Sequence, residues 1–303
     1  MLIQLPASDF TLDSTLTSGQ TFRWRRHDGW WYGCVGAAVL RVRQDGPQVV
    51  AEASEPAFGG PELARYFALD LDLADILRQI DVDLQIHAAI VRHRGVRILR
   101  QAPWETLASF ICASFNNIKR IEGMIDGLCQ AFGRPVALHG FRTFTFPDAP
   151  TLAGVSERRL RALGLGNRAP YLKATARLVA DGRLPFAQLR TLDYEGLKQV
   201  LLRCDGVGDK VADCVALFGF EQYAAFPVDV WMERAMRYYF RHRRMTRGRL
   251  HAYARRHFGP YAGYAQQYLY HYMRHAHEPA AVGVSRLDGI LEQSLHPAPL
   301  VAV

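Results

Sequence analysis

One lysine and one aspartate stand where they could act together on a substrate. Lys210 lies in the first turn of a predicted helix, directly after the glycine-containing segment 205–209. Asp229 follows nineteen residues later, just after Pro227, and opens another predicted helix. The positive end of a helix dipole disfavours a charged lysine, and a neutral amine can attack an electrophilic carbon. The pair therefore predicts covalent chemistry by an amine, assisted by a carboxylate.

Each of these residues also has an ordinary structural interpretation. A lysine after a glycine-containing turn can bind phosphate as a point charge, and the residue alone does not decide between the two roles. An aspartate at a helix start is most often an N-cap. Cys214 shares a helix face with Lys210, four residues away, but a cysteine there is more often part of the core. The combination of these residues at this spacing favours chemistry.

The segment before Lys210 predicts an anion site. Gly206 and Gly208 suit a tight hairpin that ends at a helix N-terminus. Such a hairpin directs free backbone N–H groups at an anion, and a DNA phosphate is the obvious candidate.

Charge placement also indicates a polyanionic partner. The chain has a formal net charge of +8. Between Arg234 and His277 it carries ten arginines and six histidines, with no Asp or Glu, and tyrosines are interleaved among them. A basic block of this kind neutralises phosphates. The plain alternative is a solvated arginine-rich face, but such a face would carry balancing carboxylates.

Composition narrows the class of protein. The chain has 303 residues, 49% of them hydrophobic, which is enough for a full core and two domains. No apolar run is long enough to cross a bilayer, and the start lacks a signal-peptide pattern. The five cysteines are dispersed, without the spacing of a zinc or iron–sulfur site. We therefore expect an intracellular, cytoplasmic protein with reduced thiols, no metal and no organic cofactor.

The elements that must position Lys210 and Asp229 follow from hydrophobic periodicity. The first eighty residues are predicted to be mostly strands, including Thr21–Arg25, Trp30–Gly36 and Ala38–Arg43. From about residue 83 the pattern is helical. Helices are predicted over residues 119–132, 157–163, 170–182, 193 to near 204, and 209–218, where Gly219 ends the helix. Further helices are predicted to begin at 103 and just after 229, 247 and 260.

These elements predict an α+β fold with two domains. An N-terminal antiparallel β-sheet domain is expected over residues 1–101, and a helical domain over 102–278. Residues 279–303 show no strong pattern and are expected to form a tail of uncertain order.

Several segments resemble one family. The stretch from Gly206 to Asp229 resembles the helix–hairpin–helix DNA glycosylases, and within them the 8-oxoguanine DNA glycosylase/AP lyases. Further segments that fit the same family are Ser18–Trp24, Gly95–Gln101, Phe110–Ser114, Asn116–Ile121, Leu163–Ala169 and Gly263–Gln266. The likeness covers about residues 10–275 in order. It implies that the helical domain is a helix–hairpin–helix glycosylase domain.

The resemblance implies an activity and two catalytic roles. The protein would flip 8-oxoguanine out of duplex DNA and excise it. Lys210 would attack C1′ and form a Schiff base that leads to β-elimination, and Asp229 would stabilise positive charge on the sugar and help the amine. The partner would be duplex DNA with an oxidised purine, bound by a monomer.

The resemblance also implies a base pocket. Gly19 would offer its carbonyl to the N7 hydrogen that distinguishes 8-oxoguanine from guanine. Cys214 and Tyr270 would sandwich the base, Gln266 would bind its Watson–Crick edge, and Phe218 would line the pocket. Without the resemblance, Gly19 is a turn glycine and Tyr270 is one tyrosine among many.

The DNA contacts are a longer set, with departures from the family pattern. Implied contacts are Asn116, Asn117, Arg120, Arg168, Gly206 and Gly208, with Arg120 and Arg168 reaching the orphaned cytosine or an ordinary phosphate. Phe115 stands where the family has a gap-filling asparagine, Asn167 replaces an aromatic wedge, and Trp231 replaces a histidine. We hypothesise that Phe115 now supplies the stacking surface. Cys204 and Asp205 replace Leu-Pro in the hairpin.

Three other functions are compatible with parts of the sequence. A monofunctional alkylated-base DNA glycosylase would use the aspartate with water and would not need Lys210. A non-catalytic helix–hairpin–helix DNA-binding protein would need neither Asp229 nor Lys210 beside Cys214. An RNA-binding protein is the most distant alternative, because no RNA-binding motif is present.

Overall fold

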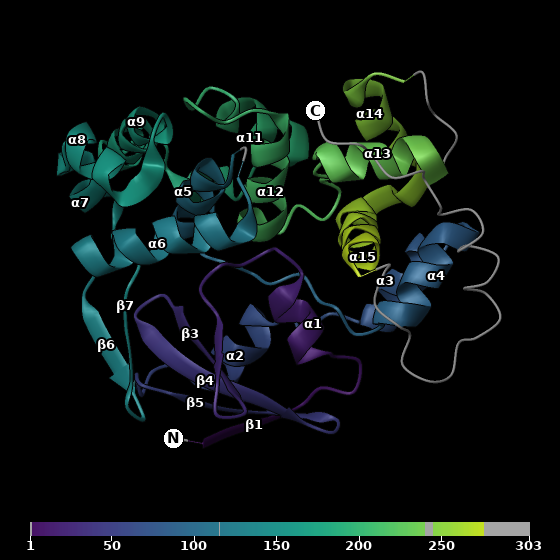
Figure 1. The fold of residues 1–303 in the computed structure, drawn as a ribbon. Coiled ribbons are helices and arrows are strands. Elements are labelled where there is room, and N and C mark those ends of the chain that lie inside the picture. The colour runs from purple at the N-terminus through teal and green to yellow at the C-terminus, as the bar shows by residue number, and fades with distance from the viewer. Residues whose placement is uncertain (1, 115, 240–244, 276–303) are drawn as a thin grey trace, which may run out of the picture.

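The computed structural model describes residues 2–114, 116–239 and 245–275. A five-stranded antiparallel sheet forms one layer of the molecule, and a larger group of helices lies over it (Figure 1). This arrangement confirms the predicted α+β class. The tail expected over residues 279–303 lies outside the described residues.

The sheet is formed by the N-terminal fifty residues. Its strands are β1 (Leu2–Pro6), β2 (Arg25–His27), β3 (Trp30–Val35), β4 (Ala38–Asp45) and β5 (Gln48–Ala53). Their spatial order is β1-β5-β4-β3-β2, so consecutive strands form a meander and β1 adds to its far edge. One face packs on a core that includes Leu40, Val42 and Ala51. Only β1 alternates clearly between buried and exposed residues, whereas β3, β4 and β5 each contain three consecutive buried residues, so the centre of the sheet is covered on both faces.

The strand predicted over Thr21–Arg25 is wrong except for its last residue. Phe22 packs edge-on against Phe110 in the helical core, with ring centroids 5.5 Å apart. Trp24 packs in the sheet core and donates from Nε1 to the Tyr66 hydroxyl. The segment therefore passes between two cores, and tertiary packing overrides its high β propensity.

The first eighty residues also contain helices that the strand prediction missed. These are α1 (Leu12–Thr17), α2 (Gly60–Tyr66) and α3 (Leu73–Ile80), followed by α4 (Leu84–His93). In α3, the Asp72 side chain caps the first turn by accepting from the Asp75 N–H. Its buried residues Leu73, Ile76, Leu77 and Ile80 follow helical spacing. The helical spacing of these apolar residues is present in the sequence, but the segment is short.

The helical layer contains the predicted helices in order, together with α7 and α10, which were not predicted. It comprises α5 (Pro103–Ala113), α6 (Ile118–Phe132), α7 (Ala149–Gly154), α8 (Glu157–Leu160), α9 (Arg168–Ala180), α10 (Phe186–Leu189), α11 (Tyr194–Leu201), α12 (Asp209–Phe220), α13 (Val230–Tyr239), α14 (Arg247–Phe258) and α15 (Ala262–Arg274), with a π-helical turn at Arg161–Leu165 and a 3-10 turn at Gly259–Tyr261.

The end predicted for α12 is wrong. Gly219 lies inside the helix, which ends at Phe220 with Glu221 as a left-handed C-cap at φ 61°. A Cβ at position 219 would lie 3.3 Å from the Pro103 Cα at the start of α5. The glycine is therefore needed for the close approach of two helices rather than for termination.

A hairpin within the helical region reaches back to the sheet. Its strands β6 (Pro135–Leu138) and β7 (Phe141–Phe144) run from the end of α6 down beside the sheet (Figure 1). Phe141 stacks on Tyr32 of β3 with centroids 4.6 Å apart, and His139 lies 2.6 Å from the Glu52 carboxylate. The hairpin was not predicted, and it ties the two layers together.

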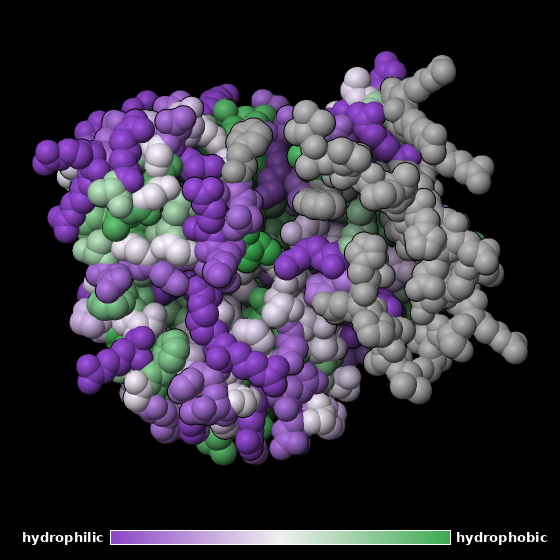
Figure 2. Space-filling view, viewed as in Figure 1, coloured by the Kyte–Doolittle hydropathy of each residue, from purple (hydrophilic) through white to green (hydrophobic). Residues whose placement is uncertain are grey.

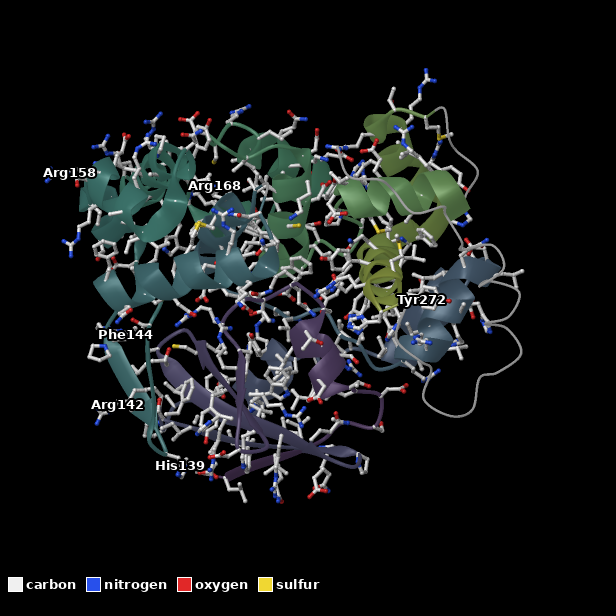
Figure 3. All side chains as sticks on the ribbon, in the orientation of Figure 1. His139, Arg142, Phe144, Arg158, Arg168 and Tyr272 are labelled. Carbon is white, nitrogen blue, oxygen red and sulfur yellow. The ribbon has the colours of Figure 1, made fainter. Side chains whose placement is uncertain are left out.

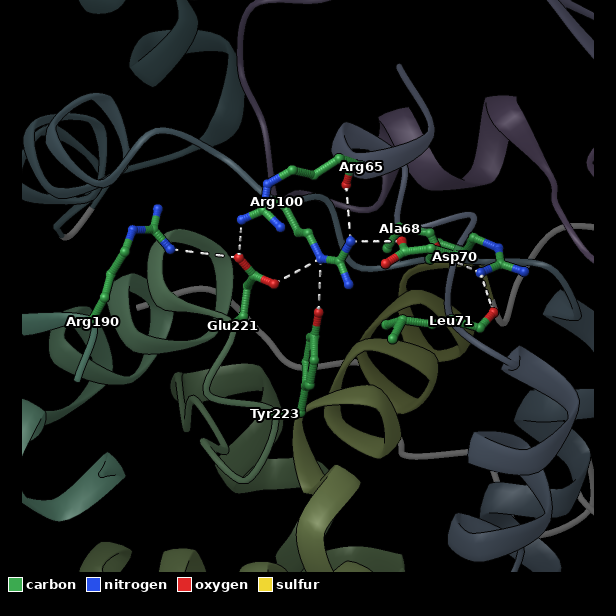
Figure 4. Close-up of polar contacts among 9 residues, drawn as sticks. Arg65, Ala68, Asp70, Leu71, Arg100, Arg190, Glu221 and Tyr223 are labelled. Atoms are coloured by element: carbon green, nitrogen blue, oxygen red, sulfur yellow. Dashed lines mark hydrogen bonds and ion pairs between the residues drawn. The ribbon is translucent and has the colours of Figure 1, made fainter. Parts of the chain in front are cut away.

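An ion-pair cluster around Glu221 also joins the helical layer to the N-terminal region (Figure 4). Its carboxylate lies 2.5 Å from Arg65, 2.8 Å from Arg100 and 3.5 Å from Arg190. Arg100 also binds Asp70 at 2.6 Å. Because Arg65 belongs to α2 and Glu221 caps α12, the cluster fixes α12 to the N-terminal region.

The five cysteines are all buried and reduced. None of the helices in residues 2–114, 116–239 and 245–275 combines the length and the apolar character that a membrane crossing requires. On the face seen in Figure 2, hydrophilic residues predominate, and hydrophobic groups gather in a hollow near the centre.

Candidate active site

The predicted hairpin is formed between α11 and α12. The Val207 N–H donates to the Cys204 carbonyl at 3.1 Å, and Gly206 adopts φ +77°. A Cβ on Gly206 would lie 2.7 Å from the Tyr171 ring, so the turn requires glycine. Gly208 is the extended N-cap of α12 and is exposed. The free N–H groups at this helix start are thus open to an anion.

A cavity lies beside α12, with a volume of about 50 Å³. Its wall contains Lys210 and Asp229, which come from two different helix starts. All five predicted base-pocket residues line it as well: Gly19, Cys214, Phe218, Gln266 and Tyr270. Residues that the sequence did not assign to the pocket are Ser18, Phe110, Pro227 and Gln267. Residues far apart in the chain therefore converge on one concave site, as ligand sites do.

The Lys210 amine lies over an aromatic surface. Its Nζ is 4.9 Å from the centroid of the Phe110 ring, and Phe110 stacks on Phe218 with centroids 5.6 Å apart. Phe110 belongs to α5, whereas Lys210 and Phe218 belong to α12. The packing of these two helices holds the amine at the cavity wall.

Asp229 has the structural role that its position suggests and also faces the cavity. Its Oδ1 accepts from the Met232 N–H at 2.7 Å, which caps the first turn of α13. This hydrogen bond fixes the rotamer of the carboxylate. Because the same residue lines the cavity, the cap orients a fixed negative charge toward the site.

Burial controls the other ionisable groups of the cavity. It raises the pKa of the Cys214 thiol to about 11, against a smaller opposing effect of Lys210. Burial also raises the pKa of Tyr270, and the Asp229 charge adds to that effect. At neutral pH the thiol and the phenol are therefore uncharged.

Two residues of the wall show features that a bound base would explain. Gly19 has φ +80°, and a Cβ there would lie 3.2 Å from the Tyr270 ring. Gln266 is buried, and its Oε1 has no hydrogen-bond partner within the described part of the chain. Leaving a buried acceptor unpaired costs about 1–3 kcal/mol. A ligand with a donor edge would restore the missing bond.

The predicted DNA contacts lie at loop ends and helix starts. Asn117 is the N-cap of α6 and accepts from the Arg120 N–H at 3.0 Å. Asn116 contacts the Met124 sulfur at 3.9 Å, and Asn167 is the N-cap of α9. Arg168, labelled in Figure 3, donates from Nε to the Ser114 carbonyl at 2.9 Å.

The remaining departures from the family pattern are Phe115, Trp231 and Asp205. Phe115 lies outside the described residues. Trp231 belongs to the first turn of α13. The predicted exchange of roles between Phe115 and Asn167 therefore stays a prediction. Asp205 is exposed at the hairpin.

Family models match most of the chain. Residues 2–107 match the 8-oxoguanine DNA glycosylase, N-terminal domain, and residues 108–258 match the HhH-GPD superfamily base excision DNA repair protein. An N-glycosylase/DNA lyase from Saccharomyces cerevisiae is 33% identical over 75% of this chain and 67% of its own length. The chain belongs to the 8-oxoguanine DNA glycosylase/lyase family. It is thus a base-excision repair enzyme rather than a purely DNA-binding module.

Other relatives agree with this family. A probable N-glycosylase/DNA lyase from Methanothermobacter thermautotrophicus is 29% identical over 90% of this chain and 96% of its own length. The Clostridium acetobutylicum 8-oxoguanine glycosylase/lyase, solved with DNA containing cytosine opposite 8-oxoguanine, has a TM-score of 0.85 and 30% identity, covering 90% of this chain and 97% of that one. A 3-methyladenine DNA-glycosylase from Archaeoglobus fulgidus shares the fold, with a TM-score of 0.74 at 19% identity over 89% of this chain and 98% of that one.

Proposed function

We propose that this enzyme excises 8-oxoguanine from duplex DNA and then cleaves the strand through a covalent imine. One observation carries the proposal: Lys210 and Asp229 share the wall of a cavity with the unpaired Oε1 of Gln266. An amine, a carboxylate and a base-edge acceptor are the groups that this reaction needs. The surrounding walls come from one chain, and we propose that it acts as a monomer.

The chemistry begins with base flipping. The target nucleotide swings out of the stack, at an unstacking cost of a few kcal/mol, and its base enters the cavity. Cys214 and Tyr270 lie against its faces, and Gln266 binds its edge. The Gly19 carbonyl accepts from N7–H of 8-oxoguanine. Guanine has an acceptor at N7, so the same carbonyl repels it.

Excision follows from attack by the amine. The Lys210 nitrogen forms a bond to C1′ as the glycosidic bond breaks, and the base leaves with the bonding electrons and takes up a proton. The Asp229 carboxylate stabilises positive charge that develops on the sugar. Ring opening at C1′–O4′ gives the imine. Loss of a C2′ proton then expels the 3′ phosphate by β-elimination.

Borohydride trapping on an 8-oxoguanine:cytosine duplex tests this mechanism. Reduction converts the imine into a stable protein–DNA adduct, which should form with the native enzyme and be lost in Lys210→Gln. Lys173→Gln is the matched control, because Lys173 lies on α9 and does not line the cavity. An adduct formed equally well by Lys210→Gln would overturn the assignment. Excision of an alkylated base without any adduct would instead support the monofunctional alternative.

A further inference from the structure

Two buried glutamines hold the turn that carries Gly19. Gln20 follows Gly19 directly and is 0% exposed, and Gln267, on α15, is 2% exposed. The Gln267 Nε2 donates to the Ser18 carbonyl at 2.7 Å. The turn is therefore held by hydrogen bonds on both sides of the glycine, by residues from two different parts of the fold.

The Gln20 amide is fully satisfied, partly within its own turn, where Nε2 also donates to the Ser18 Oγ at 3.0 Å, and partly by the backbone of the 97–99 segment. Its Nε2 donates to the carbonyls of Thr15 at 3.1 Å and Arg97 at 2.8 Å. Its Oε1 accepts from the Leu99 N–H at 2.7 Å. Burying an amide is costly unless its polar atoms are paired. Full pairing makes Gln20 a rigid link between α1 and the 97–99 segment.

The hydrogen bonds around the turn leave one carbonyl available. The Ser18 carbonyl is taken by Gln267, and the Gln20 carbonyl accepts from the Gln101 Nε2 at 2.7 Å. Between them, the Gly19 carbonyl receives no hydrogen bond from the residues that the structure describes. Gly19 and Gln267 both line the cavity. The two outer carbonyls of the turn are thus hydrogen-bonded within the protein, and the middle one is available to accept a hydrogen bond from a ligand.

We propose that Gln20 and Gln267 are positioning residues that set lesion discrimination by holding the Gly19 carbonyl in place. The proposal rests on the proposed function, in which that carbonyl distinguishes 8-oxoguanine from guanine. Gln266 and Gln267 are adjacent on α15. The same helix therefore positions the residue that binds the base edge and the residue that holds the Gly19 carbonyl in place. Within the described residues, neither glutamine hydrogen-bonds to Lys210 or Asp229, so the chemistry after base loss does not depend on this support.

The test compares two substrates on the full chain with Gln267→Met and Gln20→Met. Methionine keeps a similar length and volume but cannot donate. Single-turnover excision from an 8-oxoguanine:cytosine duplex should fall by about tenfold or more, since a misplaced hydrogen-bond acceptor forfeits roughly that much transition-state binding. Borohydride trapping at a preformed abasic site should change by less than about threefold, because that reaction needs no base recognition. The ratio of affinities for 8-oxoguanine:cytosine and guanine:cytosine duplexes should also fall.

Gln44→Met is the matched control. Gln44 also makes hydrogen bonds to distant backbone groups in the N-terminal region, in a half-buried position, donating to the Phe10 carbonyl at 2.7 Å and accepting from the Leu12 N–H at 2.8 Å. It does not line the cavity, so its loss should leave the ratio of excision to trapping unchanged.

The outcomes separate the claims. Equal loss of excision and trapping in Gln267→Met, or no loss of excision, would overturn the positioning role. If Gln20→Met does not fold, Gln267→Met alone decides. A native enzyme that traps on abasic DNA but does not excise 8-oxoguanine would contradict the proposed function itself, and the positioning role with it.

Discussion

At the scale of single residues, Asp229 combines two roles that are usually found apart. It caps α13 through the Met232 N–H, and it lines the cavity that holds Lys210. The cap needs only an acceptor oxygen, whereas stabilising a sugar cation needs a negative charge. Substitution can therefore separate the roles.

Asp229→Asn should keep the cap and lose the charge. We expect its free energy of unfolding to stay within about 0.5 kcal/mol of the native value, and its excision rate to fall by about 10²–10³. Asp229→Ala should lose both, with an added destabilisation of about 1 kcal/mol. Urea unfolding and single-turnover excision measure the two effects. Near-native excision by Asp229→Asn would show that the charge has no part in the reaction.

The residues proposed to react could be predicted from the sequence, whereas the residues that hold them in place could not. Lys210 and Asp229 have local signatures, since each stands at a helix start after a glycine or a proline. The sequence around Phe110 predicts only a core residue of an apolar helix. Its position beneath the Lys210 amine follows from the fold. Gln20 is a polar residue in a short loop, and its partners Arg97 and Leu99 are about eighty residues away. Such long-range pairings have no periodic signal.

At the scale of elements, α12 is anchored by a buried ionic cluster. Asp213 is 1% exposed, and its carboxylate lies 3.0 Å from the Lys198 Nζ, 2.5 Å from the Tyr194 hydroxyl and 3.2 Å from the His251 Nε2. Lys198 also lies 3.2 Å from Asp209 in the first turn of α12. Burial and the Asp213 charge raise the pKa of Tyr194, so its hydroxyl remains a donor. The cluster joins α11, α12 and α14 behind the hairpin.

Lys198→Met should destabilise the protein strongly. It leaves the Asp213 carboxylate buried with one cation fewer, and breaking a buried pair in this way costs about 3–5 kcal/mol. The exposed Arg158→Met serves as control and should change stability by less than about 0.5 kcal/mol. The double change Lys198→Met with Asp213→Leu should recover part of the loss. Denaturant unfolding measures all three, and a Lys198→Met change below 0.5 kcal/mol would contradict the account.

At the scale of the whole molecule, histidine rings pack in the contact between α4 and α15. The rings of His93 and His271 lie 4.5 Å apart, and His275 lies 4.3 Å from His271. Burial lowers the pKa of His93 to about 4 and that of His271 to about 3, and the neighbouring histidine and arginine charges act in the same direction. Because α15 carries Gln266 and Tyr270, this contact supports the pocket.

The contact should make folding sensitive to acid. Below pH 6.5 the unfolded chain binds protons at these histidines and the folded chain does not, so stability falls as pH decreases toward about 4. Each histidine contributes roughly 1 kcal/mol per pH unit in that window. His271→Phe should flatten the decline between pH 6.5 and 4.5, as measured by urea unfolding at each pH. An unchanged slope would contradict the assignment.

The buried thiols lead us to expect that the enzyme resists oxidation. Peroxides attack the thiolate form of cysteine, yet burial raises the pKa of Cys112 and Cys129 to about 12 and that of Cys204 to about 11, as it does for Cys214. We expect a thiol-labelling reagent to modify none of the five cysteines in the native protein and all five in denaturant. Repair activity should therefore outlast a peroxide exposure that inactivates thiolate enzymes, so that a cell under oxidative stress keeps this enzyme working while guanine is being damaged.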